Sequence, residues 1–201
     1  ANQYTIMSFN LLCGESKPTE LYGSPEARKD AVLAQIRAIK PDTLGVQECS
    51  TDWYGILCDA LGEEYAVVGE LTNREKLIWR NAVFYRRDRF ELLDSGTFWL
   101  SQTPEEVSYG WDAVCRRVCS WGYFKDKQTK KKFWFFNTHM DHKGKTARVE
   151  GAKLIIEKIK QMCGEKARVI LTGDFNVAQD SPAYNTFAMS NLLQDAYSLA
   201  P

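Results

Sequence analysis

Short segments with the apolar pattern of β-strands alternate along this chain with segments whose apolar residues recur at helical spacing. Residues 4–11 read as a strand, whereas within residues 146–162 Ala152 and Ile155 share one face of a predicted helix. We therefore expect one α+β domain dominated by a mixed sheet. The chain has no heptads and no repeat at a solenoid period. It also has no run of about 18 apolar residues, so we expect no membrane span.

The first part of the chain predicts three short strands and two helices. Ser24 and Pro25 are typical of a helix start, because serine caps the first turn and proline fits the first helical position. Pro41 ends that helix, and Gly62 ends the next one. The strands are expected at residues 4–11, 43–47 and 65–69, and the helices at residues 24–40 and 51–61.

The middle of the chain is rich in predicted strands, and the last part returns to helices. A charged turn at residues 87–89 joins two strands, and a turn at residues 126–131 closes a hairpin. Residues 102–115 are expected to form a long loop, which in compact domains is often functional. The strands are expected at residues 82–86, 90–100, 118–125, 132–139 and 169–171, and the helices at residues 146–162 and from Ser181 onward.

Charge restricts the class of ligand only weakly. The 26 basic residues balance the 26 acidic ones, and zero net charge argues against a protein that grips long duplex DNA through many phosphates. Lysines crowd the turn within residues 125–132. A solvated hairpin tip explains these lysines more simply than a nucleic-acid contact does.

The six cysteines predict neither a zinc ribbon nor a thioredoxin-type site, because no two form a Cys-x-x-Cys pair. Cys115 and Cys119 lie four residues apart, with no second pair or neighbouring histidine to complete a zinc site. We expect most of the six to be free, buried thiols. The compartment stays open, because a chain that starts at Ala1 without a signal peptide fits a processed secreted or periplasmic protein as well as a cytoplasmic one.

Four apolar strand segments end in polar residues of the kinds that bind phosphate and metal ions. These residues are Asn10, Glu48, His139 and the pair Asp174 and Asn176. If the strand ends meet at one rim, carboxylate and amide oxygens suit Mg²⁺, and an imidazole beside them can exchange a proton with phosphate or water. Each residue alone also fits a common structural role in a turn, at a helix start or on the surface. Their joint occurrence predicts a site.

The segments that carry these residues resemble the endonuclease/exonuclease/phosphatase superfamily. They are MSFNLL at 7–12, GVQECS at 45–50, FNTHMDHKGKTAR at 136–148 and LTGDFN at 171–176, and residues 84–101 and 111–121 are similar to a bacterial branch. The resemblance covers essentially the whole chain and implies a DNase I-like four-layer α/β sandwich with mixed β-sheets. Its members include magnesium-dependent DNases, abasic-site nucleases, deadenylases, inositol-polyphosphate phosphatases and neutral sphingomyelinases.

The resemblance implies a role for each residue at the predicted rim. Glu48 is the expected principal ligand of Mg²⁺, with Mn²⁺ as an alternative, and Asn10 assists at the metal or the phosphate. Asp174 is expected to orient or activate the attacking water or to touch the metal, and Asn176 to donate to the phosphate. His139 is expected to bind a non-bridging phosphate oxygen, as an imidazolium that offsets negative charge.

Further residues flank this predicted rim. Arg117 matches an arginine of many bacterial members and is expected to clamp phosphate, with Arg116 as the fallback, although a surface arginine on a strand is an equal alternative. Asp141 and His142 are expected to shape the rim rather than bind the metal directly. Gly173 is expected to let a ligand approach the backbone closely.

Two features depart from the family pattern. Where many relatives carry a glutamate before a strand, this chain has Trp79 with Asn81 close by, so the carboxylate that steadies His139 is absent or comes from another residue such as Glu75. Relatives also close with a Ser-Asp-His motif, and both histidines of this chain are already placed. We therefore expect residues 1–201 to be one domain that is shortened at its C-terminus, lacks the last strands and has weak or no hydrolase activity.

The leading functional hypothesis is Mg²⁺-assisted attack of water on the phosphorus of a small or polar phosphomonoester or phosphodiester. A DNA or RNA nuclease of the same fold is the first alternative. The second alternative is a catalytically impaired module that still binds phosphate or a partner, because the Ser-Asp-His segment is missing. We expect no obligate protein partner. Residues 102–115 belong to the loops in which specificity lies in this superfamily, so the sequence does not name the substrate.

Overall fold

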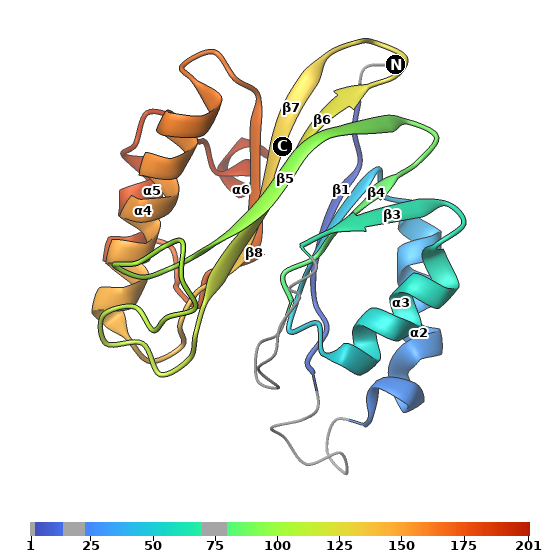
Figure 1. Ribbon diagram of the computed structural model, residues 1–201, viewed down its shortest axis with the longest axis horizontal. Coiled ribbons are helices and arrows are strands. Elements are labelled where there is room, and N and C mark those ends of the chain that lie inside the picture. The colour runs from blue at the N-terminus through green and yellow to red at the C-terminus, as the bar shows by residue number, and fades with distance from the viewer. Residues whose placement is uncertain (1–2, 14–22, 70–79) are drawn as a thin grey trace.

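The computed structural model of this chain describes residues 3–13, 23–69 and 80–201. Two four-stranded sheets, ordered β1-β2-β4-β3 and β5-β6-β7-β8, pack against each other. Helices α2 and α3 cover the outer side of the first sheet, and α4 and α5 cover that of the second (Figure 1). The resulting layers of helix, sheet, sheet and helix confirm the expected four-layer sandwich.

The first sheet contains strands from the N-terminal part of the chain. Strands β1 and β2 are parallel, whereas β4 pairs antiparallel with both β2 and β3. The strands are β1 (Ile6–Asn10), β2 (Thr43–Gln47), β3 (Tyr65–Val68) and β4 (Val83–Arg86).

The two helices behind the first sheet begin and end where the sequence predicts. In α2 (Pro25–Ile39), the Ser24 side chain accepts a hydrogen bond from the Ala27 N–H, and Lys40 ends the helix with a left-handed φ of 51°. In α3 (Thr51–Leu61), Ser50 caps in the same way by accepting from the Trp53 N–H. Both serines therefore satisfy a backbone donor that the first helical turn leaves unpaired.

The second sheet is an antiparallel meander with one parallel strand added at its edge. Strands β5 (Phe90–Trp99), β6 (Val118–Asp126) and β7 (Lys132–His139) pair antiparallel, and β8 (Val169–Asp174) pairs parallel with β7. Helix α4 (Lys145–Cys163) connects β7 to β8 across the outer face. Two short helices follow β8, namely α5 (Pro182–Ala188) and α6 (Ala196–Leu199).

Three details differ from the sequence prediction. The expectation of one mixed sheet is wrong, because residues 87–89 carry the chain from β4 in one sheet to β5 in the other. Strand β8 continues three residues past the predicted end, since its pairing with β7 runs on to Asp174 opposite His139. The four-residue helix α6 was not predicted.

The cysteines and the loop at residues 102–115 agree with the sequence predictions. All six cysteines are free, as expected, although Cys58, Cys115 and Cys163 are only half-buried. The residues 102–115 form a loop. None of the described helices is both long and apolar enough to cross a bilayer. Trp79 and Glu75 lie outside the described residues.

The inner faces of the two sheets meet through aromatic side chains at one end and polar side chains at the other. The aromatic end contains Tyr85 from the first sheet and the rings of Phe90, Phe124, Phe133 and Phe135 from the second. The polar end joins Gln47 of β2 to Asn137 of β7 by a 2.8 Å hydrogen bond from Nε2 to Oδ1.

Gly45 makes the close approach at the polar end possible. A Cβ at this position would lie 2.5 Å from Thr172 Oγ1 and 2.8 Å from Asn137 Oδ1, closer than van der Waals contact allows. Thr172 Oγ1 in turn donates to Asn137 Oδ1 over 3.1 Å. The polar end is therefore a tight junction that fixes how the carboxyl ends of the strands sit across from each other.

Candidate active site

The carboxyl ends of β1, β7 and β8 bring three predicted residues into contact. The Asn10 Nδ2 atom donates to Asp174 Oδ2 over 2.8 Å, which links the first sheet to the second. His139 is paired with Asp174 in the strand register, and its Nε2 lies 3.6 Å from the same Oδ2. Strand-end geometry thus produces the rim that the sequence predicts.

The Asp174 carboxylate is the centre of this rim. Its Oδ1 accepts a 3.1 Å hydrogen bond from the Asn176 N–H, so the two oxygens have protein donors on different sides. The side chain is 34% exposed, which leaves room for water beside it. A carboxylate held by donors but open to solvent is suited to orient a water molecule or accept its proton.

Asn176 reaches the rim because its backbone adopts a left-handed φ of 49°. Its Nδ2 donates to the Met140 carbonyl oxygen over 2.7 Å, which ties the residue to the segment that follows β7. An amide nitrogen carries two N–H groups, so a second donor remains for a ligand at the rim.

His139 is uncharged in this environment. The side chain is 6% exposed, and burial together with the nearby positive charge of Arg117 lowers its pKa to about 4. At neutral pH the ring is therefore a neutral imidazole, with one N–H to donate. Without a bound phosphate the expected imidazolium is disfavoured, because burial and the charge of Arg117 oppose a second cation more strongly than Asp174 attracts it.

Arg117 lies on the flank of the rim next to His139. Its guanidinium is buried, with Nε 3.6 Å from Asp141 Oδ1 and an Nη2 that contacts His142 Nδ1 at 3.3 Å. Because a guanidinium only donates, His142 Nδ1 is the acceptor in this contact. Arg116, the fallback, instead stacks on the ring of Tyr109 at 4.8 Å.

Asp141 organises the loop around that arginine, as the sequence prediction of a shaping role implies. Its carboxylate accepts hydrogen bonds from the backbone N–H groups of Cys115, Lys143 and Gly144. Burial opposes ionisation, but these donors outweigh it and hold the pKa of the carboxyl below its usual value. Asp141 thus stays ionised beside Arg117 and fixes its place.

Glu48 directly follows β2, and β2 pairs with β1 so that Gln47 lies opposite Asn10. The residue has a left-handed φ of 53° and is half-buried. Its carboxylate makes no hydrogen bond or ion pair with the residues that the structure describes. A half-buried carboxylate that the described residues leave without a hydrogen bond, just after the strand residue paired with Asn10, is an oxygen donor of the type that Mg²⁺ prefers.

A different group of ligand-type side chains lies beside Arg117. Within the described part of the chain, one group of three or more His, Cys, Asp and Glu side chains has its ligand atoms within 4.8 Å of one another, and it consists of Cys115, Asp141 and His142. Glu48 and Asp174 do not belong to such a group. The sequence prediction missed this proximity, because Cys115 lies in a loop far from His142 along the chain.

The polar junction beneath the rim was also missed as a part of the site. Asn137 Nδ2 donates to the carbonyl oxygens of Val46 and Ala82, so this one side chain holds β2, β4 and β7 together. In the sequence, an asparagine that directly follows an apolar strand segment could have indicated this junction. Packing also explains why residue 173 is a glycine. A Cβ there would lie 2.5 Å from the Thr138 carbonyl oxygen, so the glycine is needed whether or not a ligand approaches the backbone.

Comparison with known proteins agrees with the fold and with the strand-end motifs. The family model described as "Endonuclease/Exonuclease/phosphatase family" matches residues 7–198. A solved family protein from Bacteroides thetaiotaomicron is 39% identical, with a TM-score of 0.87 over 96% of this chain and 71% of that one. A second structure, a mannosyl-6-phosphatase from the same species, is also 39% identical, with a TM-score of 0.85 over 98% of this chain and 74% of that one.

Curated relatives are more distant and longer. An uncharacterized protein of Acanthamoeba polyphaga mimivirus is 28% identical over 83% of this chain, and Xenopus laevis nocturnin is 26% identical over 98%. The matches span 64% and 54% of the lengths of those two proteins. Because the family model covers nearly the whole sequence, this chain belongs to the endonuclease/exonuclease/phosphatase family.

Proposed function

We propose that this chain carries the metal-binding and phosphate-binding part of a phosphoester hydrolase that uses water as its nucleophile. The observation that carries the proposal is the contact of Asn10, His139 and Asp174 across the two sheets, with a solvent-facing carboxylate at its centre. Family membership supports phosphoester chemistry at this rim. The contact between Asn10 and Asp174 also links the two sheets, but that structural role does not require the buried imidazole of His139 beside the same carboxylate.

Each residue has a role that follows from its position. Glu48 and Asn10 would hold Mg²⁺, with Mn²⁺ as an alternative, and the bound ion would polarise the phosphoryl group. Asp174 would orient the attacking water and accept its proton. The neutral ring of His139 and the free N–H of Asn176 would donate to non-bridging phosphate oxygens, where negative charge grows in the transition state.

Arg117 would supply the positive charge nearest to the bound phosphate. Its guanidinium is already partly neutralised by Asp141, which keeps a buried cation tolerable when no phosphate is bound. A phosphate that reached the flank of the rim would compete with His142 for the Nη2 donor. This arrangement supports a clamp that engages only when the anion arrives.

We favour a phosphomonoester of a small polar compound as the substrate. The zero net charge and the 39% identity to a mannosyl-6-phosphatase both support this choice. A nuclease of the same fold is the alternative, since a relative at 26% identity is named nocturnin. A binding module without turnover is the other alternative, because the chain has only two histidines and both lie on this one flank.

We also propose that further structure covers the outer side of β8 in longer members of the family. The solved relatives are longer than this chain, and every residue of the edge strand β8 is only half-buried. A groove of about 920 Å³ runs beside β8, and its lining includes Val169, Leu171 and Phe187 as well as the polar residues Gln179 and Asp195. In those longer proteins, additional strands or loops would cover this surface and bring further catalytic groups to the rim.

The experiment is an assay of p-nitrophenyl phosphate, mannose 6-phosphate, bis(p-nitrophenyl) phosphate and a single-stranded oligonucleotide with Mg²⁺, run on residues 1–201 and on any longer product of the same gene. We expect Mg²⁺-dependent turnover of a monoester, with higher activity in a longer product than in residues 1–201. Glu48→Gln should abolish turnover, whereas Glu91→Gln, a matched change at an exposed position of β5, should not. Phosphate release that does not depend on Mg²⁺ or on Glu48 would contradict the proposal.

A further inference from the structure

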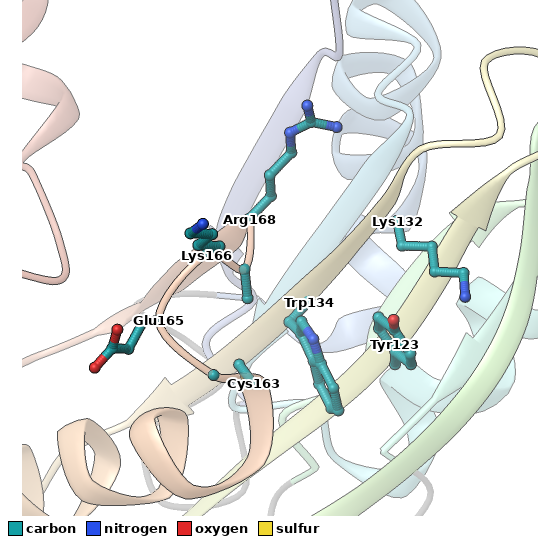
Figure 2. Close-up of a pocket in the computed structure, with 9 residues that line it drawn as sticks. Tyr123, Lys132, Trp134, Cys163, Glu165, Lys166 and Arg168 are labelled. Carbon is teal, nitrogen blue, oxygen red and sulfur yellow. The ribbon is translucent and has the colours of Figure 1, made fainter.

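An aromatic and basic pocket lies on the outer face of the second sheet, away from the rim. Tyr123 of β6 and Trp134 of β7 are paired in the strand register, and their rings stack with centroids 4.1 Å apart and planes at 15°. They line a pocket of about 670 Å³ together with the connection from α4 to β8 (Figure 2). Neither ring is fully buried, so both are available to a ligand.

The pocket lies where the chain passes from α4 to β8. The helix ends at Cys163, and Gly164 turns the chain with a φ of 77°. The chain then enters β8 at Val169, which lies opposite Trp134 in the register. Phe136 is fully buried in the cluster that packs against α4, whereas Trp134 is only partly buried at the edge of that cluster.

Three cations surround the two rings. Lys132, Lys166 and Arg168 are exposed and line the pocket, and the described residues give none of their side chains a carboxylate partner. Figure 2 shows Lys132 on one side of the stacked rings, with Lys166 and Arg168 on the other. Glu165 is the acidic residue in the lining, so the pocket is positive in a chain whose net charge is zero.

We propose that this pocket is a binding site for single-stranded nucleic acid, separate from the rim. Flat aromatic faces stack on bases of any sequence, and cations on both sides of them match the phosphates that flank a base. An apolar protein segment would leave the three cations without partners, and a neutral sugar would do the same. Lys132 lies 6.0 Å from the centre of the Tyr123 ring, and the described residues give none of the three cations a carboxylate. The combination of rings and such cations therefore favours a strand with exposed bases and a charged backbone.

The position of the pocket makes it an accessory site. Trp134 precedes His139 by five residues along β7, which at about 3.3 Å per residue separates them by roughly 16 Å. A bound strand would thus contact the pocket several nucleotides from any phosphate at the rim. The proposal does not depend on hydrolysis, and it holds whichever ester the rim cleaves.

The test is fluorescence anisotropy of a labelled 12-nucleotide oligo(U) with residues 1–201 in EDTA, so that no metal-dependent cleavage occurs. Stacking on an aromatic side chain contributes roughly 1–3 kcal/mol per base, so Trp134→Ala should weaken binding about ten-fold or more. Reversal of Lys132, Lys166 and Arg168 to Glu should abolish binding. The logarithm of affinity should fall with the logarithm of salt concentration with a slope of about −2, as expected for roughly three phosphate contacts.

Two matched variants serve as controls. Tyr197→Ala removes an aromatic ring that is 78% exposed on α6, and Arg37→Glu reverses an exposed charge on α2. Both should bind the oligonucleotide as the unmodified chain does. The proposal is overturned if no saturable binding occurs, or if folded Trp134→Ala and charge-reversed variants keep their affinity within two-fold. It is also overturned if an anionic oligosaccharide competes as well as RNA and Trp134→Ala leaves both affinities unchanged.

Discussion

The two ends of the interface between the sheets use opposite chemistry for the same task of holding one sheet against the other. At the end away from the rim, the ring of Tyr85 from the first sheet lies 4.8 Å from the ring of Phe124 in the second, centre to centre. At the rim end, Asn137 and Gln47 join the sheets through directional hydrogen bonds. Aromatic packing tolerates small displacements, whereas a hydrogen-bonded junction sets strand positions to within a few tenths of an ångström. The difference indicates that the aromatic end stabilises the fold and the polar end positions the site.

The largest effect on stability is expected at the aromatic end. Phe124→Ala removes a fully buried ring, so the free energy of unfolding should fall by roughly 3–5 kcal/mol. Chemical denaturation measures this loss. Wherever the variant is still folded, its Mg²⁺ binding should equal that of the unmodified chain. A folded Phe124→Ala protein with weakened Mg²⁺ binding would contradict the claim that the aromatic end only stabilises the fold while the polar end positions the site.

The second effect is a pH dependence that arises at the rim. The pKa of His139 is lowered from 6.5 to about 4 in the fold by burial and Arg117, with Asp174, His142 and Asp141 also facing it. The unfolded chain therefore binds the additional proton between these values, so stability is complete above pH 6.5 and is lost as pH falls towards 4. The loss is roughly 3 kcal/mol, at 1.36 kcal/mol per pKa unit.

Thermal unfolding between pH 4 and 7 measures this dependence. His139→Gln should remove most of the slope in that window. Asp126 is a separate contributor, because its pKa of about 2 places its effect below pH 4, where the acidic form of an aspartate appears. A slope that His139→Gln leaves intact would show that the buried imidazole is not its source.

The third effect tests the polar junction itself. Asn137→Ala removes the hydrogen bonds that this side chain makes with Gln47 and with the Val46 and Ala82 carbonyl oxygens, which should cost roughly 2–3 kcal/mol. Unlike Phe124→Ala, this variant should also lose Mg²⁺ affinity, because β2 and β7 both carry rim residues. Thr172→Val, which removes a single hydrogen bond to Asn137, should cost about 1 kcal/mol and serves as the milder comparison.

The smallest effect comes from overfilling the junction. Gly45→Ala places a methyl group 2.5 Å from Thr172 Oγ1, and the strain should lower the free energy of unfolding by roughly 1–2 kcal/mol. The double variant Gly45→Ala with Thr172→Ala removes the obstructing hydroxyl. It should therefore be more stable than the sum of the two single changes predicts. Simple additivity would show that the two residues do not meet in solution.

Most of the elements could be predicted from the sequence, because periodicity and capping are local. The helix expected at residues 146–162 is observed as Lys145–Cys163, and the serine cap of α2 is where it was expected. Strand pairing is not local, so periodicity did not place the separation of the two sheets at residues 87–89, and only the family resemblance implied more than one sheet. Periodicity shows which residues share a face of a strand, but not which strand lies beside it.

The candidate site likewise has features that could be predicted from the sequence and features that could not. Asn10, His139 and Asp174 could be predicted to meet, since each ends a strand and strand ends collect at one rim. The protonation of His139 could not be predicted, because it depends on burial and on Arg117, which comes from the loop just before β6. Cys115 beside His142 could not be predicted either, since a loop places it there.

The central claim is that the rim binds Mg²⁺ through Glu48, and isothermal titration of Mg²⁺ into the chain tests it most directly. The titration is run on the unmodified chain, on Glu48→Gln and on the surface variant Glu91→Gln, each confirmed as folded by circular dichroism. The account predicts saturable binding to the unmodified chain and to Glu91→Gln, and none to Glu48→Gln. Equal binding by all three proteins would contradict it.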